Sequence, residues 1–240
     1  MPLVIRENLP AYLSDLKKWL CEARDIPLEE MDHFFTARIA GYEAHMACWG
    51  EAYRRLAQAV PGSCRRLLDL GCGTGLELDQ IFERLPALEV TGIDLSGAML
   101  AALRRKHPEK RLTLRCEDYF QAELGAEEYD AAVSFESLHH FYPEAKQGLF
   151  EKLCRALKPG GVYLECDYIA CCEEEETLLR REYERKRGQS DLPEGKFAHF
   201  DIPLTLEHET ALLRRAGFSQ VEAVDSICGA TLLHAVKPSR

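Results

Sequence analysis

The chain has 240 residues, of which 46% are hydrophobic, and its formal net charge is −10 at pH 7. No apolar run reaches the roughly 18 residues of a transmembrane helix, so no membrane span is expected. An acidic chain is repelled by phosphate backbones, which disfavours a nucleic-acid substrate. The first residues lack a basic stretch followed by an apolar one, so we expect a cytoplasmic protein.

The ten cysteines give no sign of disulfides or of a metal site. No two of them stand in a Cys-x-x-Cys pair, and Cys171 and Cys172 are adjacent. Most of the others fall in predicted strands or helices. We therefore expect free, mostly buried thiols and no metal.

Residues 1–60 are predicted to form an N-terminal helical extension. Its first part carries apolar residues at helical spacing, namely Leu9, Leu13, Leu16 and Leu20. Residues 31–60 favour one or two further helices, which Pro61 and Gly62 end.

From residue 65 onward, predicted strands and helices alternate. Strands are expected over residues 67–70, 89–93, 112–115, 129–135, 162–167, 219–225 and 230–236, and helices over residues 76–85, 96–106, 143–157, 173–187 and 205–216. Such alternation is typical of an α/β fold with a doubly wound, largely parallel sheet and helices on both faces. Residues 159–161, Pro-Gly-Gly, are expected to form a turn before the fifth strand.

The most informative segment is Leu67–Gly75, an apolar strand that runs into a glycine-rich turn. Glycine permits positive φ and close approach of a ligand, and the helix that follows offers free N–H groups. The dinucleotide fingerprint G-x-G-x-x-G fails, because Leu76 or Leu78 stands where the third glycine is required. Asp69 would repel a pyrophosphate but suits an ammonium group. The turn therefore predicts a cofactor with an amino-acid part and an adenosine but no phosphate.

Acidic residues end or follow three successive predicted strands. They are Asp69, Asp94 and Asp118. In an open parallel sheet, ligands bind beyond the carboxyl ends of the strands. We therefore expect these side chains to lie together at the cofactor site.

These segments resemble the motifs of the class I S-adenosylmethionine-dependent methyltransferases. In chain order the resemblance is carried by Leu67–Gly75, Val90–Ser96, Cys116–Tyr119, Tyr129–Ser134 with Leu138–Phe141, and Leu157–Gly161. It implies a Rossmann-like sheet of seven strands, with the last antiparallel and entering as a hairpin. It also implies a methyltransferase domain over residues 61–240, preceded by the helical extension as a lid.

The resemblance also implies a set of cofactor contacts. They are Tyr42, Asp69, Gly71, Cys72, Gly73, Asp94, Leu95, Met99, Asp118, Tyr119 and Ser134. Asp69 and the glycine backbone would hold the methionine part, and Asp94 would accept hydrogen bonds from the ribose hydroxyls. Leu95 and Met99 would pack on the adenine, whose amino group Asp118 would bind.

The residues that bind the methyl acceptor are harder to identify from the sequence. The cofactor carries its own leaving group, so the reaction requires few catalytic side chains. His139, His199 and Asp201 are the candidate catalytic residues, with ordinary loop packing as the alternative. Glu165 and Asp167 alternate onto one face of their strand and would line the acceptor pocket, or else lie at the surface. Tyr42, from the N-terminal segment, would close over the methionine end of the cofactor.

The sequence thus predicts in-line methyl transfer from S-adenosylmethionine to the O, N or S atom of a small molecule, with S-adenosylhomocysteine as product. Two alternatives stay open. One is a tRNA-base methyltransferase, and the other is a protein that binds an S-adenosyl cofactor without methylating anything.

Overall fold

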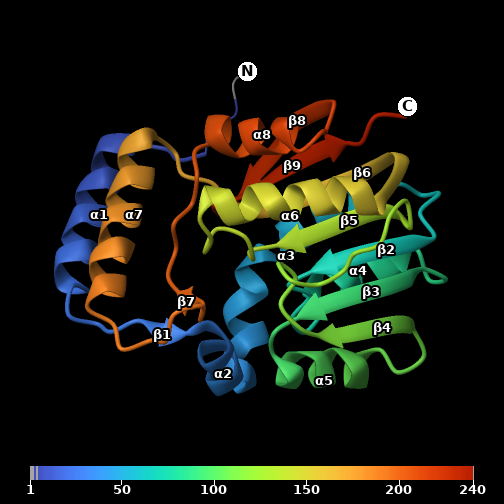
Figure 1. The fold of residues 1–240 in the computed structure, drawn as a ribbon, viewed down its shortest axis with the longest axis horizontal. Helices are drawn as coiled ribbons and strands as arrows, with labels where there is room; N and C mark the ends of the chain where they lie inside the picture. Colours follow the sequence, from blue (N-terminus) through green and yellow to red (C-terminus); the bar gives the residue numbers. More distant parts are fainter. Residues whose placement is uncertain (1–2, 4, 240) are drawn as a thin grey trace.

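The computed structural model describes residue 3 and residues 5–239 (Figure 1). Its helices are α1 (Leu9–Glu22), α2 (Met31–Met46), the short 3₁₀ helix η1 (Ala47–Trp49), α3 (Gly50–Ala59), α4 (Leu76–Arg84), α5 (Gly97–Lys106), α6 (Pro143–Ala156), α7 (Glu173–Gly188) and α8 (Leu206–Arg215). Its strands are β1 (Glu29–Glu30), β2 (Arg66–Leu70), β3 (Glu89–Asp94), β4 (Arg111–Cys116), β5 (Tyr129–Phe135), β6 (Leu157–Tyr168), β7 (Ala198–His199), β8 (Gln220–Ile227) and β9 (Ala230–Val236). Within this range, no helix is both long and apolar enough to cross a membrane.

In the described part of the chain, seven strands form one sheet in the order β4-β3-β2-β5-β6-β9-β8. Neighbours from β4 to β6 are parallel, and β9 runs antiparallel to both β6 and β8. The β8–β9 hairpin turns at Cys228 and Gly229, which both have positive φ, as a tight two-residue turn requires. The expected α/β fold, with its antiparallel last strand, is confirmed.

Helices cover both faces of the sheet, because successive strand residues point to opposite sides. In β2, Leu67 packs in one hydrophobic cluster with residues of α3, α4 and α5, and Leu68 packs in another with residues of α6 and α8. Both side chains are fully buried. This double burial is typical of a parallel sheet, whose strands are apolar on both faces.

The expected turn at residues 159–161 appears as an irregularity within the bounds of β6. The pairing with β5 jumps from Leu157 to Val162, and Gly160 has φ +75°. The segment is also tied to residues beyond β9, because the Gly160 N–H donates to the Lys237 carbonyl and the Lys237 N–H donates to the Gly161 carbonyl at 2.9 Å. These backbone hydrogen bonds hold a Pro-Gly-Gly sequence that favours a turn at the start of the strand.

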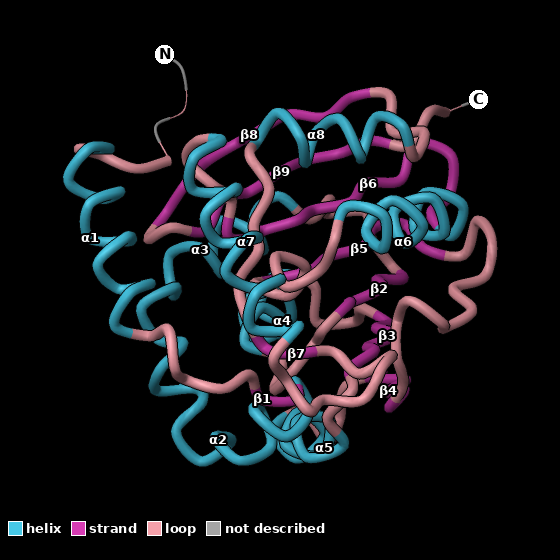
Figure 2. Tube along the Cα trace, turned by 60° about the vertical axis from the view of Figure 1, so that its left-hand side comes forward, coloured by secondary structure: helices cyan, strands magenta, loops and turns pink. Residues whose placement is uncertain are grey.

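A cap beside the sheet is assembled from two distant parts of the chain. Helices α1 and α7 pack against each other and lie away from strands β2, β3 and β4 in Figure 1, and Figure 2 shows α1 and β4 at opposite sides of the molecule. Leu13, Leu16 and Leu179 form their shared apolar cluster. Below them, β1 pairs antiparallel with β7, with Glu29 opposite His199. The first 60 residues therefore contribute α1 and β1 to the cap and α3 to the face of the sheet.

A buried ionic cluster fastens α6 and α8 to the sheet. Lys146 of α6 donates a hydrogen bond to the Glu209 carboxylate of α8, and its Nζ lies 3.9 Å from Glu165 of β6. Burial and the adjacent Glu209 raise the pKa of Glu165 well above its ordinary value. Glu165 therefore belongs to this internal cluster, so neither of the two positions that the sequence allowed for it, the acceptor pocket or the surface, is correct.

Replacing Lys146 with Met would leave the Glu209 carboxylate buried without its cation. We expect the free energy of unfolding to fall by about 3–5 kcal/mol, measured by urea denaturation. The double variant Lys146→Met/Glu209→Leu removes both charges and should recover most of that loss. Equal losses in the single and double variants would contradict the ionic interpretation.

Candidate active site

The glycine-rich turn crosses the carboxyl edge of the sheet between β2 and α4. Gly71 has φ +72°, and a side chain there would overlap the Ser137 hydroxyl. The Gly71 N–H donates to the Ile93 carbonyl at 2.8 Å, which ties the turn to the end of β3. Because glycine has no side chain, a ligand above this turn could approach its backbone closely.

Asp94, the last residue of β3, holds this turn in place. Its two carboxylate oxygens accept hydrogen bonds from the Gly73 N–H at 2.9 Å and from the Ser96 N–H at 2.8 Å. Each carboxylate oxygen has a second lone pair, so Asp94 can still accept bonds from a ligand. Burial raises the pKa of Asp94, and the two N–H donors oppose that rise.

A first cavity opens over the turn. Seven of the residues predicted to bind the cofactor line it: Tyr42, Gly71, Gly73, Asp94, Leu95, Met99 and Tyr119. They come from α2, from the ends of β2 and β3, from α5 and from the loop after β4. The sequence motifs therefore converge on one hollow at the carboxyl edge of the sheet.

The other four residues predicted at the cofactor site do not line this cavity. The Cys72 side chain packs in the core, and the Ser134 hydroxyl hydrogen-bonds the Tyr163 hydroxyl at 2.7 Å. Asp118 accepts a hydrogen bond from the Phe120 N–H at 2.8 Å and so caps a turn after β4. Any contact of Cys72 or Ser134 with a cofactor would therefore come from the backbone.

Asp69 is the fourth, and it lies beneath the turn as a buried acid. Neither of its carboxylate oxygens has a hydrogen-bond partner among the described residues, and neither has Oε1 of nearby Glu77. Burial and the Glu77 carboxyl raise the pKa of Asp69 well above its ordinary value. Asp69 and Glu77 thus face each other as a buried pair of carboxyl groups with no salt-bridge partner among the described residues, and a nearby ammonium group would compensate their charge.

A second, open cavity adjoins the first. Four residues line both cavities: Phe35, Tyr42, Glu136 and His140. The remaining wall of the second cavity contains all three residues predicted to be catalytic, which are His139, His199 and Asp201. The structure therefore brings together side chains from loops that are 60 residues apart.

His139 is the centre of this wall. Its Nδ1 hydrogen-bonds the Asp167 carboxylate at the end of β6, and its Nε2 lies 3.4 Å from the Asp201 carboxylate. Burial alone would lower the pKa of His139, but the two carboxylates outweigh burial and raise that pKa well above its ordinary value. The ring is thus a buried cation held between two acids.

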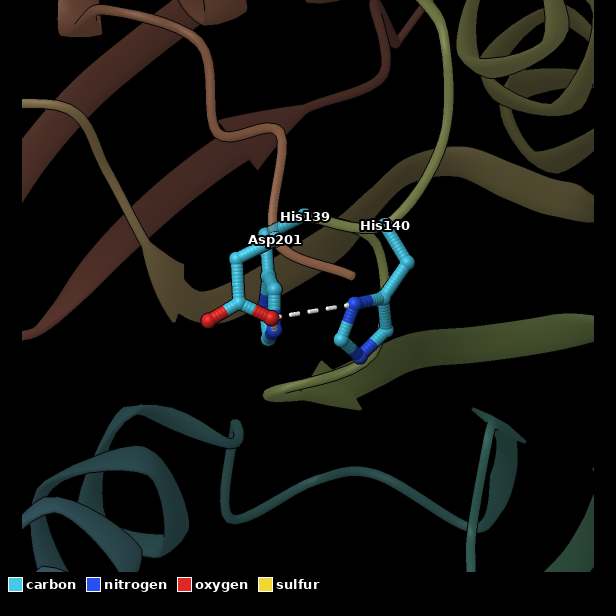
Figure 3. Close-up of side chains that lie close together, drawn as sticks. All are labelled: His139, His140 and Asp201. Atoms are coloured by element: carbon cyan, nitrogen blue, oxygen red, sulfur yellow. Dashed lines mark ion pairs between the residues drawn. The ribbon is translucent and has the colours of Figure 1, made fainter. Parts of the chain in front are cut away.

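His140 and His199 are neutral rings on the same wall. His140 Nδ1 lies 3.1 Å from the Phe200 carbonyl and 3.3 Å from Asp201 (Figure 3). His199 stacks on Phe34, with ring centroids 3.5 Å apart. Burial and the neighbouring His140 lower the pKa of His199 to about 3.

The sequence analysis missed Glu136, the residue directly after β5. It has φ +45°, which is rare for a residue with a side chain, and its Oε1 has no hydrogen-bond partner among the described residues. Burial raises the pKa of Glu136 to about 8. The sequence signal that could have identified Glu136 is an acidic residue directly after an apolar strand, which is the signal that identified Asp94.

Comparisons with known proteins agree with this geometry. A family model described as "Methyltransferase domain" matches residues 67–161. Carboxy-S-adenosyl-L-methionine synthase of Chromohalobacter salexigens is 31% identical over 167 residues, covering 64% of this chain and 61% of that protein. Trans-aconitate 2-methyltransferase of an Acidovorax species is 32% identical over 113 residues, covering 46% of this chain and 41% of that protein.

Among solved structures, human N-acetylserotonin methyltransferase in complex with SAM has a TM-score of 0.66 at 19% identity, covering 95% of this chain and 66% of that one. At this identity the similarity supports the fold alone. The chain spans about six tenths of the length of the Chromohalobacter relative.

The backbone strain and the unpartnered carboxyl of Glu136 should cost stability. We expect Glu136→Gly to raise the free energy of unfolding by about 1–2 kcal/mol, measured by thermal and urea unfolding. The matched control is Glu127→Gly, because Glu127 also has positive φ, at +54°, but is exposed. A gain no larger than that of the control would mean that the buried carboxyl carries no cost.

Proposed function

Because the chain belongs to the class I S-adenosylmethionine-dependent methyltransferase family, we propose that it transfers the cofactor's methyl group to the O, N or S atom of a small molecule. One observation carries the proposal: the cavity over the glycine turn and the open cavity beside it meet at Phe35, Tyr42, Glu136 and His140. A methyl donor bound in the first cavity and an acceptor bound in the second would face one another at these four residues.

The residues around the first cavity fit the cofactor. The free lone pairs of Asp94, which lines the cavity, support binding of its ribose hydroxyls, and the buried Asp69 beneath the turn adds negative charge that favours its amino group. Leu95 and Met99 offer apolar surface to an adenine ring. The Tyr42 ring of α2 borders both cavities, which supports its role as a lid over the methionine end.

The bound cofactor supplies an activated methyl group, so the protein has to hold the acceptor in line and keep water out. The acceptor would rest between a polar wall and an aromatic one. The polar wall comprises His139, His199 and Asp201, and the aromatic wall comprises Phe34, Phe35 and Trp49. The Asp201 side chain is 43% exposed, so it is accessible from the cavity.

Two other functions receive less support. Three relatives are named carboxy-S-adenosyl-L-methionine synthase, which suggests a carboxylated form of the cofactor. The two aspartates Asp167 and Asp201 outnumber the one cationic ring, His139, near the boundary of the two cavities, which disfavours an added carboxylate there. The net charge of −10 likewise disfavours a tRNA substrate.

Asp94 provides a test of the cofactor site. We expect Asp94→Ala to weaken S-adenosylhomocysteine binding on the order of 100-fold, because two hydrogen bonds to a buried carboxylate are lost. Isothermal titration calorimetry measures the change, and Asp15→Asn on the surface of α1 is the control. Unchanged affinity of Asp94→Ala would refute the assigned ribose contact.

The function itself is tested with the purified full-length chain, S-adenosylmethionine and a panel of small alcohols, phenols, amines and thiols. We expect S-adenosylhomocysteine to form with at least one acceptor class, and formation to be lost in Asp94→Ala. Mass spectrometry of the products and of any co-purified nucleotide distinguishes the alternatives. Methylation of tRNA alone, or a carboxylated cofactor, would replace the proposed function.

A further inference from the structure

The polar wall of the second cavity contains a set of groups suited to a metal ion. One ring nitrogen each of His139 and His140 and a carboxylate oxygen of Asp201 lie within 4.8 Å of one another (Figure 3). A second set, formed by Glu136, His139 and Asp167, meets the same distance limit and shares His139. Four further potential ligands therefore surround His139 at the boundary with the first cavity.

Both histidines are oriented by hydrogen bonds through Nδ1. The Asp167 carboxylate binds Nδ1 of His139, and the Phe200 carbonyl lies 3.1 Å from Nδ1 of His140. The same Nδ1 of His140 lies 3.3 Å from Asp201, so the nitrogen that His140 keeps free for an ion is Nε2. Metal-binding histidines are held in this way, by a carboxylate or a backbone carbonyl, because this fixes the ring and leaves the other nitrogen for the ion. Asp167 itself is fixed by the Leu138 N–H at 2.7 Å.

An independent observation is a buried polar atom beside the cluster that lacks a hydrogen-bond partner. Oε1 of Glu136 is buried and has no hydrogen-bond partner among the described residues. In that same part of the chain, no Lys or Arg side chain lies within ion-pair distance of Glu136, Asp167 or Asp201, and the ion pairs recorded for the two aspartates involve only histidine. A buried carboxyl without a partner is costly, so this cluster would be stabilised by a further cation.

We propose that His139, His140 and Asp201 bind a divalent transition-metal ion, with Glu136 as a further ligand and Asp167 as the positioning residue. Two imidazoles and a carboxylate suit ions such as Zn²⁺ or Fe²⁺, whereas Mg²⁺ and Ca²⁺ prefer oxygen ligands. On binding, the ion takes the place of the proton between His139 and Asp201, which leaves to solvent. Its remaining positions face the cavity.

The role of this ion rests on the proposed function, although its binding does not. An acceptor oxygen or nitrogen bound to the ion would be held beside the first cavity, and the ion would promote loss of its proton. The substrate class that this favours is a small molecule with a hydroxyl, enol or similar metal-binding group next to the methylated atom.

The test uses the full-length protein, stripped with a chelator and then titrated with Zn²⁺ by calorimetry, with elemental analysis for stoichiometry. We expect one ion per chain. Asp201→Ala and His140→Ala should each weaken binding on the order of 100-fold, and Asp167→Asn on the order of 10- to 100-fold. The visible spectrum of a Co²⁺ complex should change in the same variants, and Mg²⁺ should not compete.

The matched control is His208→Ala. His208 belongs to another cluster, with the exposed Glu173 and the buried Glu176, that meets the same distance limit. Its loss should leave the Zn²⁺ affinity unchanged. Less than one ion per chain, equal affinity in the Asp201 variant, or loss of binding in the His208 variant would each overturn the proposal.

S-adenosylhomocysteine affinity, measured on every variant, shows that each one folds and separates the two hypotheses. A chain that binds the nucleotide and methylates an acceptor but takes up no ion refutes the metal site and leaves the proposed function standing. A chain that binds the ion but forms no S-adenosylhomocysteine with any acceptor refutes the proposed function and leaves the metal site standing.

Discussion

The buried pair of His139 and Asp167 connects the three segments that make up the acceptor side. His139 follows β5, Asp167 ends β6, and the loop after β7 is joined to both by Asp201 and by the hydrogen bond from the Ile202 N–H to the His139 carbonyl at 2.7 Å. Because β7 pairs with β1, the same connection reaches the cap. The position of the cavity walls therefore depends on one charged hydrogen bond inside the protein, where such bonds are strong.

Buried acids are arranged differently in the core and at the cavities. In the core, Lys146 sits between Glu165 and Glu209 and supplies the cation that the cluster needs. At the carboxyl edge of the sheet, Asp69 and Glu136 are buried without such a partner among the described residues. Unpartnered groups and backbone strain persist where a bound ligand can compensate for their cost, so the contrast separates the groups that build the fold from those that meet ligands.

Local patterns predicted most of the fold and the cofactor side of the site. The strands from β2 to β5 and the glycine turn depend on residues close in sequence, and a strand end fixes where its last acid lies. The cap could not be predicted in this way, because α1 and α7 are joined only through contacts such as Leu13 with Leu179. Nor could the metal-binding arrangement, since its ligands come from loops 60 residues apart while the cysteine spacing, the usual sequence signal, is absent.

The sequence by itself determined the sheet, its glycine turn and the kind of cofactor, because turn geometry, strand periodicity and the charge of an acid beside a ligand are local properties. Only the tertiary structure decided which polar side chains face one another. It placed Glu165 in the core and the next inward-facing acid of β6, Asp167, against His139, although both lie on the same face of one strand. The physical reason is that the environment of a side chain is set by the elements packed over it. Helices α6 and α8 cover Glu165, whereas the loops after β5 and β7 cover Asp167.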